Sequence, residues 1–355
     1  GMNIYLILIL TILVLNNVRK NQRISDKLFC IIICALFILI TGLRHNVVGS
    51  DTTVYYLQFQ EIKQMSLANV IALGKRDFGF FIFEWLVAKC FHDFVVLTLS
   101  VACVFYIPIT LLIYRYSEDK GLSYLILMAF MFFQFSMTGV RQTMALGFAI
   151  MCMLELLKEK KNIVRVVIWF WLGTIVHRSC LIILPFLLIY LFRRSRIIAK
   201  SCLVILPIAF LFRGQLTVMA SSIFENLGFE LEQYGGGSGG LTTFLVYLLL
   251  FVWGMFFTYI GEADYELQPL WLSMMGVATV LQVFVLVNSV FFRVVWYYSI
   301  FLTIYIPKMI CASRVEGRSY ALINYAILFG LLYMYLGITI GSANVLPYQF
   351  FWQGL

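Results

Sequence analysis

The chain has 355 residues, of which 62% are hydrophobic and 12% are charged, and its formal net charge at pH 7 is +9. Soluble domains carry about 25% charged residues, so this composition excludes an ordinary water-soluble protein and indicates a polytopic membrane protein. A span needs about 20 apolar residues, and a dozen spans leave no room for a separate soluble domain of ordinary size. Most Lys and Arg lie in short loops between apolar runs, a pattern that reflects topology and gives no indication of nucleic-acid binding.

The apolar runs are too long for buried strands and predict an all-α protein. We expect about twelve transmembrane helices in one integral membrane domain over residues 1–355. In chain order, the predicted spans are 2–17, 27–43, 92–114, 121–138, 140–157, 162–177, 179–192, 197–212, 241–260, 269–289, 290–311 and 320–340. Residues 78–91 are too few to span alone and are interpreted as a re-entrant or interfacial helix, or as an extension of the third span.

Basic residues gather on alternate connections between these spans. The positive-inside rule places those connections in the cytoplasm and both termini on the outer face. The clustered residues are Arg19, Lys20, Arg23, Lys27, Arg115, Lys120, Lys158, Lys160, Lys161, Arg165, Arg193, Arg194, Arg196, Lys200, Lys308, Arg314 and Arg318. The outer face then carries two long loops, 44–77 and 213–240. The second ends in the glycine-rich run Tyr234–Gly240, which we interpret as a mobile loop, either a gate or a plain linker.

Arginines recur at span ends on this outer face, where positive charge is disfavoured: Arg44, Arg141, Arg178 and Arg293. Arg141 and Arg293 stand at the starts of predicted helices, where the helix dipole repels a cation, so an anionic partner would offset the penalty. Because helix N-termini with arginines form phosphate sites, we predict that these residues bind a phosphate or diphosphate. The alternative for any single arginine is an anchor to lipid phosphate.

Three side chains are candidates for proton transfer. Asp51 is the only carboxylate within residues 44–60 and is either a helix cap or a general base. His177 lies in an apolar run and is either a hydrogen-bonded structural residue or part of the site. Glu84 is a carboxylate within a short apolar stretch, a placement that indicates function by default. The nearby Tyr55 is either a platform for sugar rings or part of an interfacial aromatic belt.

Six short motifs follow one another in the order of a known family pattern. They are Thr41–Tyr56, Asp77–Trp85, Gly139–Gln142, His177–Ser179, Phe292–Pro307 and Pro347–Tyr348. As an ordered set they resemble the EpsG family of Wzy-like polymerases of bacterial exopolysaccharide and capsule. The sequence departs from the family pattern at two positions, because Asp77 replaces a glutamate and Val176 replaces an aromatic residue. The resemblance covers nearly the whole chain.

The resemblance implies an activity, a fold and partners. Such polymerases transfer a growing glycan from undecaprenyl diphosphate to a new lipid-linked repeat unit, so donor and acceptor are both undecaprenyl-diphosphate-linked oligosaccharides. The reaction takes place at the outer, periplasmic face of the bacterial cytoplasmic membrane and releases undecaprenyl diphosphate. The resemblance further implies a fold related to the GT-C glycosyltransferases, no nucleotide-sugar cofactor, and a membrane chain-length regulator as a partner within the lipid bilayer.

The predicted mechanism distributes roles among these residues. The arginines bind the diphosphate, and Asp51, His177 or Glu84 accepts the proton of the acceptor hydroxyl. A single inverting displacement and a double displacement both stay open. No compact set of metal ligands is evident, so we expect a metal-independent enzyme without a cofactor. The residues assigned to substrate binding are His45, Tyr55, Gln142, Tyr297 and Tyr348.

Two other functions fit part of the sequence. A flippase or exporter of lipid-linked oligosaccharide would also hold arginines for a diphosphate. Transporters, however, carry polar residues near the bilayer midplane and often internal repeats, and neither is evident here. A membrane O-acyltransferase acting on glycans would use His177 as its base, but no cytoplasmic motif for an acyl donor is evident.

Overall fold

The computed structural model describes residues 3–73, 77–226, 239–257, 267–314, 330 and 343–353. Within these residues the regular elements are helices, and one isolated antiparallel bridge pairs Arg44 with Phe350. The all-α prediction is therefore confirmed for the described part of the chain. Internal contacts divide the chain into unit 1, Gly1–Cys180 with Tyr325–Leu355, and unit 2, Leu181–Asn324. The organisation as one integral membrane domain stays a prediction.

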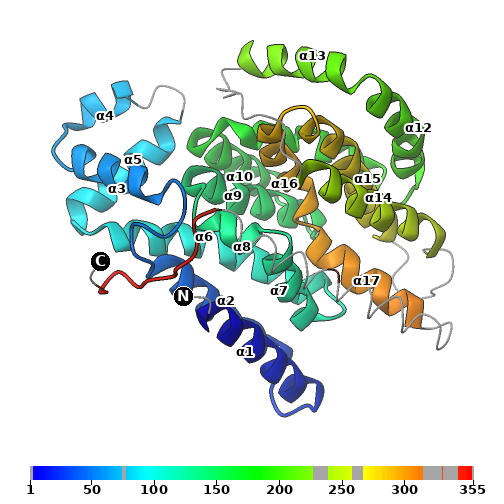
Figure 1. The fold of residues 1–355 in the computed structure, drawn as a ribbon, viewed down its shortest axis with the longest axis horizontal. Coiled ribbons are helices and arrows are strands. Elements are labelled where there is room, and N and C mark those ends of the chain that lie inside the picture. The colour runs from blue at the N-terminus through cyan, green and yellow to red at the C-terminus, as the bar shows by residue number, and fades with distance from the viewer. Residues whose placement is uncertain are drawn as a thin grey trace. The chain divides into compact units, whose positions relative to one another are not determined.

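Unit 1 contains the first ten α-helices of the chain (Figure 1). They are α1 (Asn3–Lys20), α2 (Asp26–Gly42), α3 (Thr52–Ile62), α4 (Leu67–Leu73), α5 (Phe78–Cys90), α6 (Phe94–Tyr116), α7 (Lys120–Ala129), α8 (Phe132–Ser136), α9 (Val140–Leu157) and α10 (Ile163–Val176). A 3₁₀ turn, η1 (Arg178–Ile183), follows α10 and continues into unit 2.

In the core of unit 1, helix α6 packs against both α2 and α9. The hydroxyl of Thr98, near the start of α6, donates to the carbonyl of Gly42 at the end of α2 (2.6 Å), so these two helices run antiparallel. At Gly147 of α9, an added Cβ would lie 2.1 Å from the carbonyl oxygen of Val104 in α6. The missing side chain lets these two helix backbones approach closely, as small residues do in membrane bundles.

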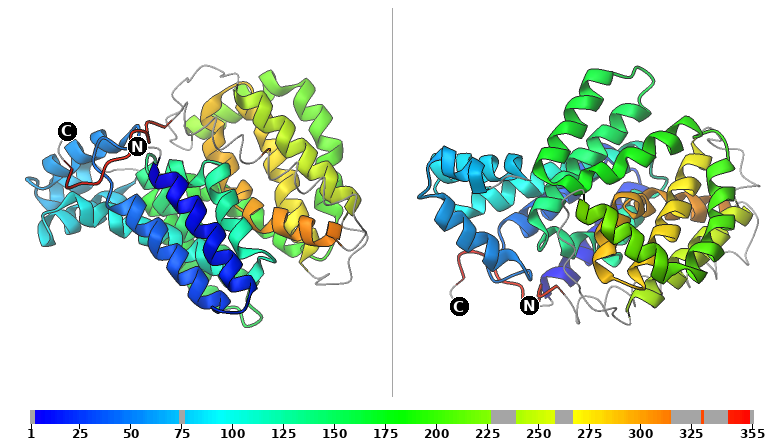
Figure 2. Two further views of the ribbon diagram at one scale, coloured as in Figure 1. Left: turned by 60° about the horizontal axis from the view of Figure 1, so that its bottom comes forward. Right: turned by 90° about the horizontal axis from the view of Figure 1, so that it is seen from above.

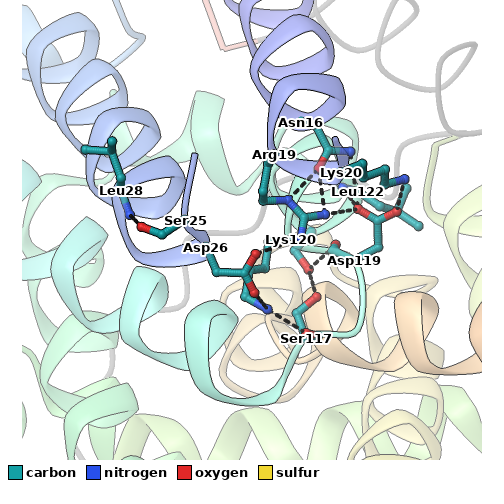
Figure 3. Close-up of polar contacts among 11 residues, drawn as sticks. Asn16, Arg19, Lys20, Ser25, Asp26, Leu28, Ser117, Asp119, Lys120 and Leu122 are labelled. Atoms are coloured by element: carbon teal, nitrogen blue, oxygen red, sulfur yellow. Dashed lines mark hydrogen bonds and ion pairs between the residues drawn. The ribbon is translucent and has the colours of Figure 1, made fainter. Parts of the chain in front are cut away.

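An ionic cluster holds one end of unit 1 together (Figure 3). We call it the Asp119 cluster, and its members are Arg19, Lys20, Asp26, Asp119 and Lys120. Across elements, Lys20 pairs with Asp119 at 2.8 Å and Lys120 pairs with Asp26 at 3.0 Å. The connections α1–α2 and α6–α7 therefore lie together, as expected for two basic connections on one face. Their placement in the cytoplasm stays a prediction.

Unit 2 is built around α15 (Gln268–Val285), which packs against α12 (Ile197–Leu211), α14 (Gly239–Phe257) and α16 (Phe292–Ser299). The other elements are α11 (Leu184–Leu191), α13 (Arg213–Asn226), η2 (Ser289–Phe291) and α17 (Leu302–Arg314). Figure 2 shows α14 and α15 alongside each other. The buried hydroxyl of Tyr305 in α17 donates to the carbonyl of Leu250 in α14 (2.7 Å), which ties these helices together within the apolar interior.

Three helices in the described part of the chain, α6, α9 and α15, are long and apolar enough to cross a membrane. The number rises to five if each of two bent helix pairs is one span: α12 with α13, bent by 98°, and residues 289–299 with 302–311, bent by 57°. These helices agree with a membrane protein. The expected total of about twelve spans and the GT-C-related architecture stay predictions, and the last predicted span, 320–340, lies almost wholly outside the described residues.

The predicted long loop 44–77 contains two helices, α3 and α4. In α3 the buried residues Thr52, Phe59 and Ile62 recur at helical spacing and give one apolar face. A hydropathy window of membrane length, about 20 residues, misses α3 because the helix has only 11 residues and is averaged with the polar residues around it. Residues 78–90 form α5, a helix of 13 residues that is not among the candidate spans.

Other predicted elements differ in continuity. The predicted span 121–138 is broken between α7 and α8 at Met131, whose φ of 66° is left-handed. The predicted span 179–192 begins with the 3₁₀ turn η1. The predicted loop 213–240 begins with the helix α13, and most of its glycine-rich run lies outside the described residues. Hydropathy reports how apolar a segment is and does not register these local changes of backbone direction.

Candidate functional site

Arg141 lies in the first turn of α9, at the end of unit 1 away from the Asp119 cluster. Helix α2 begins at Asp26 of that cluster and ends near the segment before α3. At the start of α3 the Thr52 hydroxyl donates to the carbonyl of Met137 (2.8 Å), just before α9, so the start of α9 lies at the opposite end of α2 from the Asp119 cluster. Around Arg141 the structure gathers side chains from α3, α5 and α9. We call this group the Arg141 cluster, and its members are Tyr55, Gln58, Asp77, Glu84 and Arg141.

The guanidinium of Arg141 is held from two sides. Its Nε donates to the hydroxyl of Tyr55 (3.3 Å), and its Nη1 pairs with Asp77 Oδ2 (3.2 Å). It also lies over the ring of Phe81, with 5.8 Å between its Cζ and the ring centroid. The Arg141 side chain keeps 33% of its surface exposed, and its Nη2 has no hydrogen-bond partner among the described residues. One nitrogen of a rigidly held cation is therefore available to an anion.

Asp77 is an anionic partner of Arg141, of the kind that the sequence predicts this arginine to need. A cation in the first turn of a helix is disfavoured by the helix dipole, and an anionic partner offsets that penalty. The structure supplies such a partner from the protein itself, because Asp77 pairs with Arg141. The diphosphate role predicted for Arg141 therefore rests on its remaining exposed nitrogen, and no longer on an unmet need for negative charge.

Glu84 is fully buried in α5, about two helical turns after Asp77. Gln58 Nε2 donates to its Oε2 (2.6 Å), while its Oε1 has no partner among the described residues. Burial raises the pKa of Glu84 to about 8, and this effect outweighs the lowering by the Gln58 hydrogen bond and by the charge of Arg141. Glu84 is therefore mostly protonated at neutral pH and adds little negative charge beside Arg141.

His177 ends α10, and the turn that follows brings it to the same region. Its Nδ1 accepts a hydrogen bond from the backbone N–H of Ser179 (3.2 Å) and lies 2.6 Å from the Ser179 hydroxyl. A backbone N–H can only donate, so Nδ1 carries no proton and the neutral imidazole is protonated on Nε2. In this arrangement His177 is a hydrogen-bond donor through Nε2, and its one basic nitrogen is already engaged.

The turn after His177 is tied directly to the Arg141 cluster. The backbone N–H of Arg178 donates to Asp77 Oδ1 (3.3 Å), and α10 packs against α5. Residues that lie far apart in the sequence, namely Tyr55, Glu84, Arg141, His177 and Arg178, are thus brought to one place by Asp77 and α5. They are five of the twelve residues predicted for the site.

Asp51 stands at the N-cap position of α3 and is partly exposed. Its side chain makes no capping hydrogen bond, so helix capping does not account for this carboxylate. Asp51, Tyr55 and Gln58 recur at helical spacing, and the latter two contact Arg141 and Glu84. This spacing places Asp51 on the same side of α3, one turn before the Tyr55 that binds Arg141.

The C-terminal segment 343–353 packs against the end of α2 and the segment that follows it. Three predicted residues lie in this contact: Arg44, His45 and Tyr348. Arg44 is 2% exposed and donates through Nη1 to the carbonyl of Thr41 in the last turn of α2, where a cation is favourable. His45 donates its backbone N–H to Gln349 (2.8 Å), and the Tyr348 hydroxyl donates to Ile40 (2.6 Å). These contacts give Arg44 and Tyr348 structural roles, and substrate binding by the three residues stays a prediction.

The remaining predicted residues lie in two places. Gln142 is buried in α9 directly after Arg141. Arg293 and Tyr297 belong to α16 of unit 2, where Tyr297 is fully buried and the Arg293 guanidinium lies over the ring of Phe292, 5.9 Å from its centroid. Their roles in diphosphate and substrate binding stay predictions.

Two members of the Arg141 cluster were not predicted as site residues. Asp77 occurs in one of the family-like motifs, at the position where it replaces a glutamate, and that carboxylate was the signal that could have found it. Gln58 stands seven residues after Asp51, two turns along one helix, but this signal needs α3 to be recognised as a helix. Within the described residues, no group of three or more His, Cys, Asp or Glu is placed to hold a metal ion, and metal independence stays a prediction.

The apolar helices and this charged cluster at their ends define a helical membrane protein. Residues 27–350 match the model of the EpsG family, and the chain belongs to that family. Membership points to a glycosyltransferase-like polysaccharide polymerase in exopolysaccharide biosynthesis. The comparisons found no matching curated protein and no matching solved structure.

Proposed function

We propose that the chain joins undecaprenyl-diphosphate-linked oligosaccharide repeat units at the outer face of the bacterial cytoplasmic membrane and releases undecaprenyl diphosphate, without a metal ion. The family supports a polymerase, and the Arg141 cluster supports a site for an anionic leaving group. A GT-C-related architecture, a periplasmic site and a membrane chain-length regulator as partner belong to the same proposal.

The observation that carries the proposal is the state of Arg141. Its guanidinium is fixed by Tyr55 and Asp77, yet a third of its surface is exposed and Nη2 has no partner among the described residues. A guanidinium binds a phosphate oxygen well, because its donors are planar and its charge is permanent. Positioned before the reaction starts, it stabilises the charge that develops on the leaving diphosphate.

In the proposed step one bond forms, one bond breaks and one proton is transferred. The oxygen of the acceptor hydroxyl bonds to the anomeric carbon of the donor glycan. The bond from that carbon to the diphosphate oxygen breaks, and its electron pair leaves on undecaprenyl diphosphate against Arg141. The hydroxyl proton passes to Asp51, which we favour over His177 because Asp51 makes no capping bond, whereas Nδ1 of His177 already accepts the Ser179 N–H.

Glu84 has a different place in this scheme. A second ionised carboxylate beside Arg141 would repel the diphosphate, and burial keeps Glu84 mostly protonated, with a pKa of about 8. Within the Arg141 cluster, Glu84 therefore supplies a neutral hydrogen-bonding group and does not take the acceptor proton at neutral pH.

The test uses the full chain in proteoliposomes supplied with the cognate lipid-linked repeat unit. Wild type is expected to give a ladder of glycans on a gel, and Arg141→Ala is expected to lower polymer formation by about 10²- to 10³-fold, because it removes a preorganised charge contact. Arg115→Ala is the matched control, since Arg115 is an exposed cation at the other end of α6. A normal ladder from Arg141→Ala would contradict the proposed site.

The same preparation separates the rival functions. A flippase would move single repeat units across the bilayer without lengthening them, and an O-acyltransferase would add an acyl mass to the glycan at constant length. Either outcome for wild type would refute a polymerase. Loss of the ladder with a chelator and its return with Mg²⁺ would refute metal independence.

A further inference from the structure

Asp77 occupies the N-cap position of α5, but it does not cap this helix. Its side chain makes no hydrogen bond to the first N–H groups of α5. Aspartate is favoured at such positions because its carboxylate normally accepts one of those N–H groups. Asp93, at the same position of α6, does so by accepting the N–H of Val95 (2.9 Å). The Asp77 carboxylate is therefore committed elsewhere.

Both carboxylate oxygens of Asp77 contact neighbouring elements. Oδ2 pairs with Arg141 Nη1 in α9 (3.2 Å), and Oδ1 accepts the backbone N–H of Arg178 in the turn after α10 (3.3 Å). The side chain is only 14% exposed, which shields both contacts from water. A single rigid group thus sets the position of the Arg141 guanidinium relative to the turn that carries His177.

We propose that Asp77 is a positioning residue that ties the Arg141 guanidinium to the turn after α10 and so holds the guanidinium where it meets the leaving diphosphate. This inference rests on the proposed function, because Arg141 is the group assigned there to the leaving diphosphate. Asp77 itself does not touch the substrate. Reactions in preorganised sites lose rate steeply when a binding group shifts by about 1 Å, so the spacing matters for kcat.

The two oxygens allow the two contacts to be removed separately. Asp77→Asn keeps an amide oxygen for the Arg178 N–H but replaces the charged partner of Arg141 with an NH₂ group. A guanidinium has no hydrogen-bond acceptor, so it cannot accept a hydrogen bond from that NH₂ group. Asp77→Ala removes both contacts, and Asp77→Glu restores the charge on a longer side chain. Asp93→Asn is the matched control, because asparagine caps a helix as well as aspartate does.

Kinetics in proteoliposomes give the first readout. Asp77→Asn is expected to lower kcat by about 10- to 100-fold while KM for the lipid-linked donor stays unchanged or falls, because Arg141 loses its competing anion but also its fixed position. Asp77→Glu is expected to recover part of kcat, and Asp93→Asn to match wild type. A residue needed only for folding would instead lower the amount of folded protein and leave the kcat of the folded fraction and its KM unchanged. That result, or a wild-type kcat in Asp77→Asn, overturns the proposal.

Hydrogen exchange of the full chain in nanodiscs gives a readout that does not need activity. The Arg178 amide is expected to exchange at least about 10-fold faster in Asp77→Ala than in wild type, and at nearly the wild-type rate in Asp77→Asn. Unchanged exchange in Asp77→Ala overturns the positioning role. If wild type forms no polymer, the proposed function fails, and hydrogen exchange alone decides whether Asp77 aligns the turn.

Discussion

The two ends of unit 1 use the same residue types in opposite ways. In the Asp119 cluster, Asp119 caps α7 by accepting the N–H of Leu122 (3.2 Å) and pairs with Lys20. In the Arg141 cluster and beside it, Asp77 and Asp51 stand at N-cap positions and make no capping bond. Composition alone cannot separate these ends, because both combine arginine or lysine with aspartate at a helix start.

The carboxyl pKa values follow the same division. Burial raises the pKa of Asp119, but hydrogen bonds from Lys20 and the Leu122 N–H, together with nearby charges, lower it further, so the net value lies below the usual range. Burial raises the pKa of Glu84 to about 8, although the hydrogen bond from Gln58 and the charge of Arg141 both lower it. One end stabilises its charges and the other keeps a carboxyl group neutral, and perturbed groups of the second kind gather at functional sites.

The largest effect that tests this contrast concerns Asp51. Asp51→Asn is expected to lower polymer formation by about 10²-fold or more, since a general base contributes at least that much. Because Asp51 makes no capping bond, the same change is expected to alter the free energy of unfolding by less than about 0.5 kcal/mol. Gel analysis of the glycan and thermal unfolding in detergent measure the two quantities.

Glu61→Gln is the matched control for Asp51, because Glu61 is an exposed carboxylate near the end of the same helix. It is expected to change neither quantity. A loss of activity in Asp51→Asn that only parallels a loss of folded protein would show that Asp51 is structural, and the contrast with Asp119 would disappear.

The next effect is a pH dependence of stability caused by Glu84. Between about pH 4.5 and pH 8 the folded chain keeps a proton on Glu84 that the unfolded chain has lost, because the folded pKa is raised to about 8. The stabilisation is therefore complete below the unfolded pKa and is lost as the pH rises toward the folded pKa, by at most about 1.4 kcal/mol per pH unit. Glu84→Gln removes the titration, so its unfolding temperature relative to wild type is expected to increase from pH 5 to pH 8.

Thermal unfolding of the purified protein at a series of pH values measures this difference. Glu61→Gln is again the control, and its difference from wild type is expected to be independent of pH. A flat difference for Glu84→Gln as well would mean that Glu84 is ionised at neutral pH, which would remove the division between the two clusters.

Much of unit 1 could be predicted from the sequence, because its long helices are marked by apolar runs and its ends by charges. The predicted spans 140–157 and 162–177 match α9 and α10 closely. The predicted site residues Tyr55, Glu84, Arg141, His177 and Arg178 do meet, because each stands in or next to a helix end or a short helix on one side of unit 1.

The rest required tertiary structure. Asp77 and Asp51 look like ordinary helix caps in the sequence, and only the observed hydrogen bonds show that they are not. The tautomer of His177 follows from the Ser179 backbone N–H, a contact that depends on the exact turn after α10. The burial of Arg44 under a segment that lies about 300 residues later in the chain, at Phe350, could not be predicted either, and its anion-binding role stays a prediction. Such contacts depend on which segments pack together, which local patterns do not encode.

The smallest expected effect separates capping from charge at the Asp119 cluster. Asp119→Ala removes the cap of α7 and the pairing with Lys20, and is expected to lower the free energy of unfolding by about 1–2 kcal/mol at neutral pH. Asp119→Asn keeps an oxygen for the Leu122 N–H and is expected to lose only about 0.2–1 kcal/mol, the usual contribution of an ion pair near the surface.

Because the folded pKa of Asp119 lies below its unfolded value, the stabilisation from the ion pair is present above the unfolded pKa and disappears as the pH falls through the folded pKa. Thermal unfolding of both variants at neutral and acidic pH measures these losses, and the polymerisation rate per folded molecule is expected to stay at the wild-type level. A fall in that rate with little loss of stability would make the Asp119 cluster part of the active machinery, and the comparison between the two ends of unit 1 would fail.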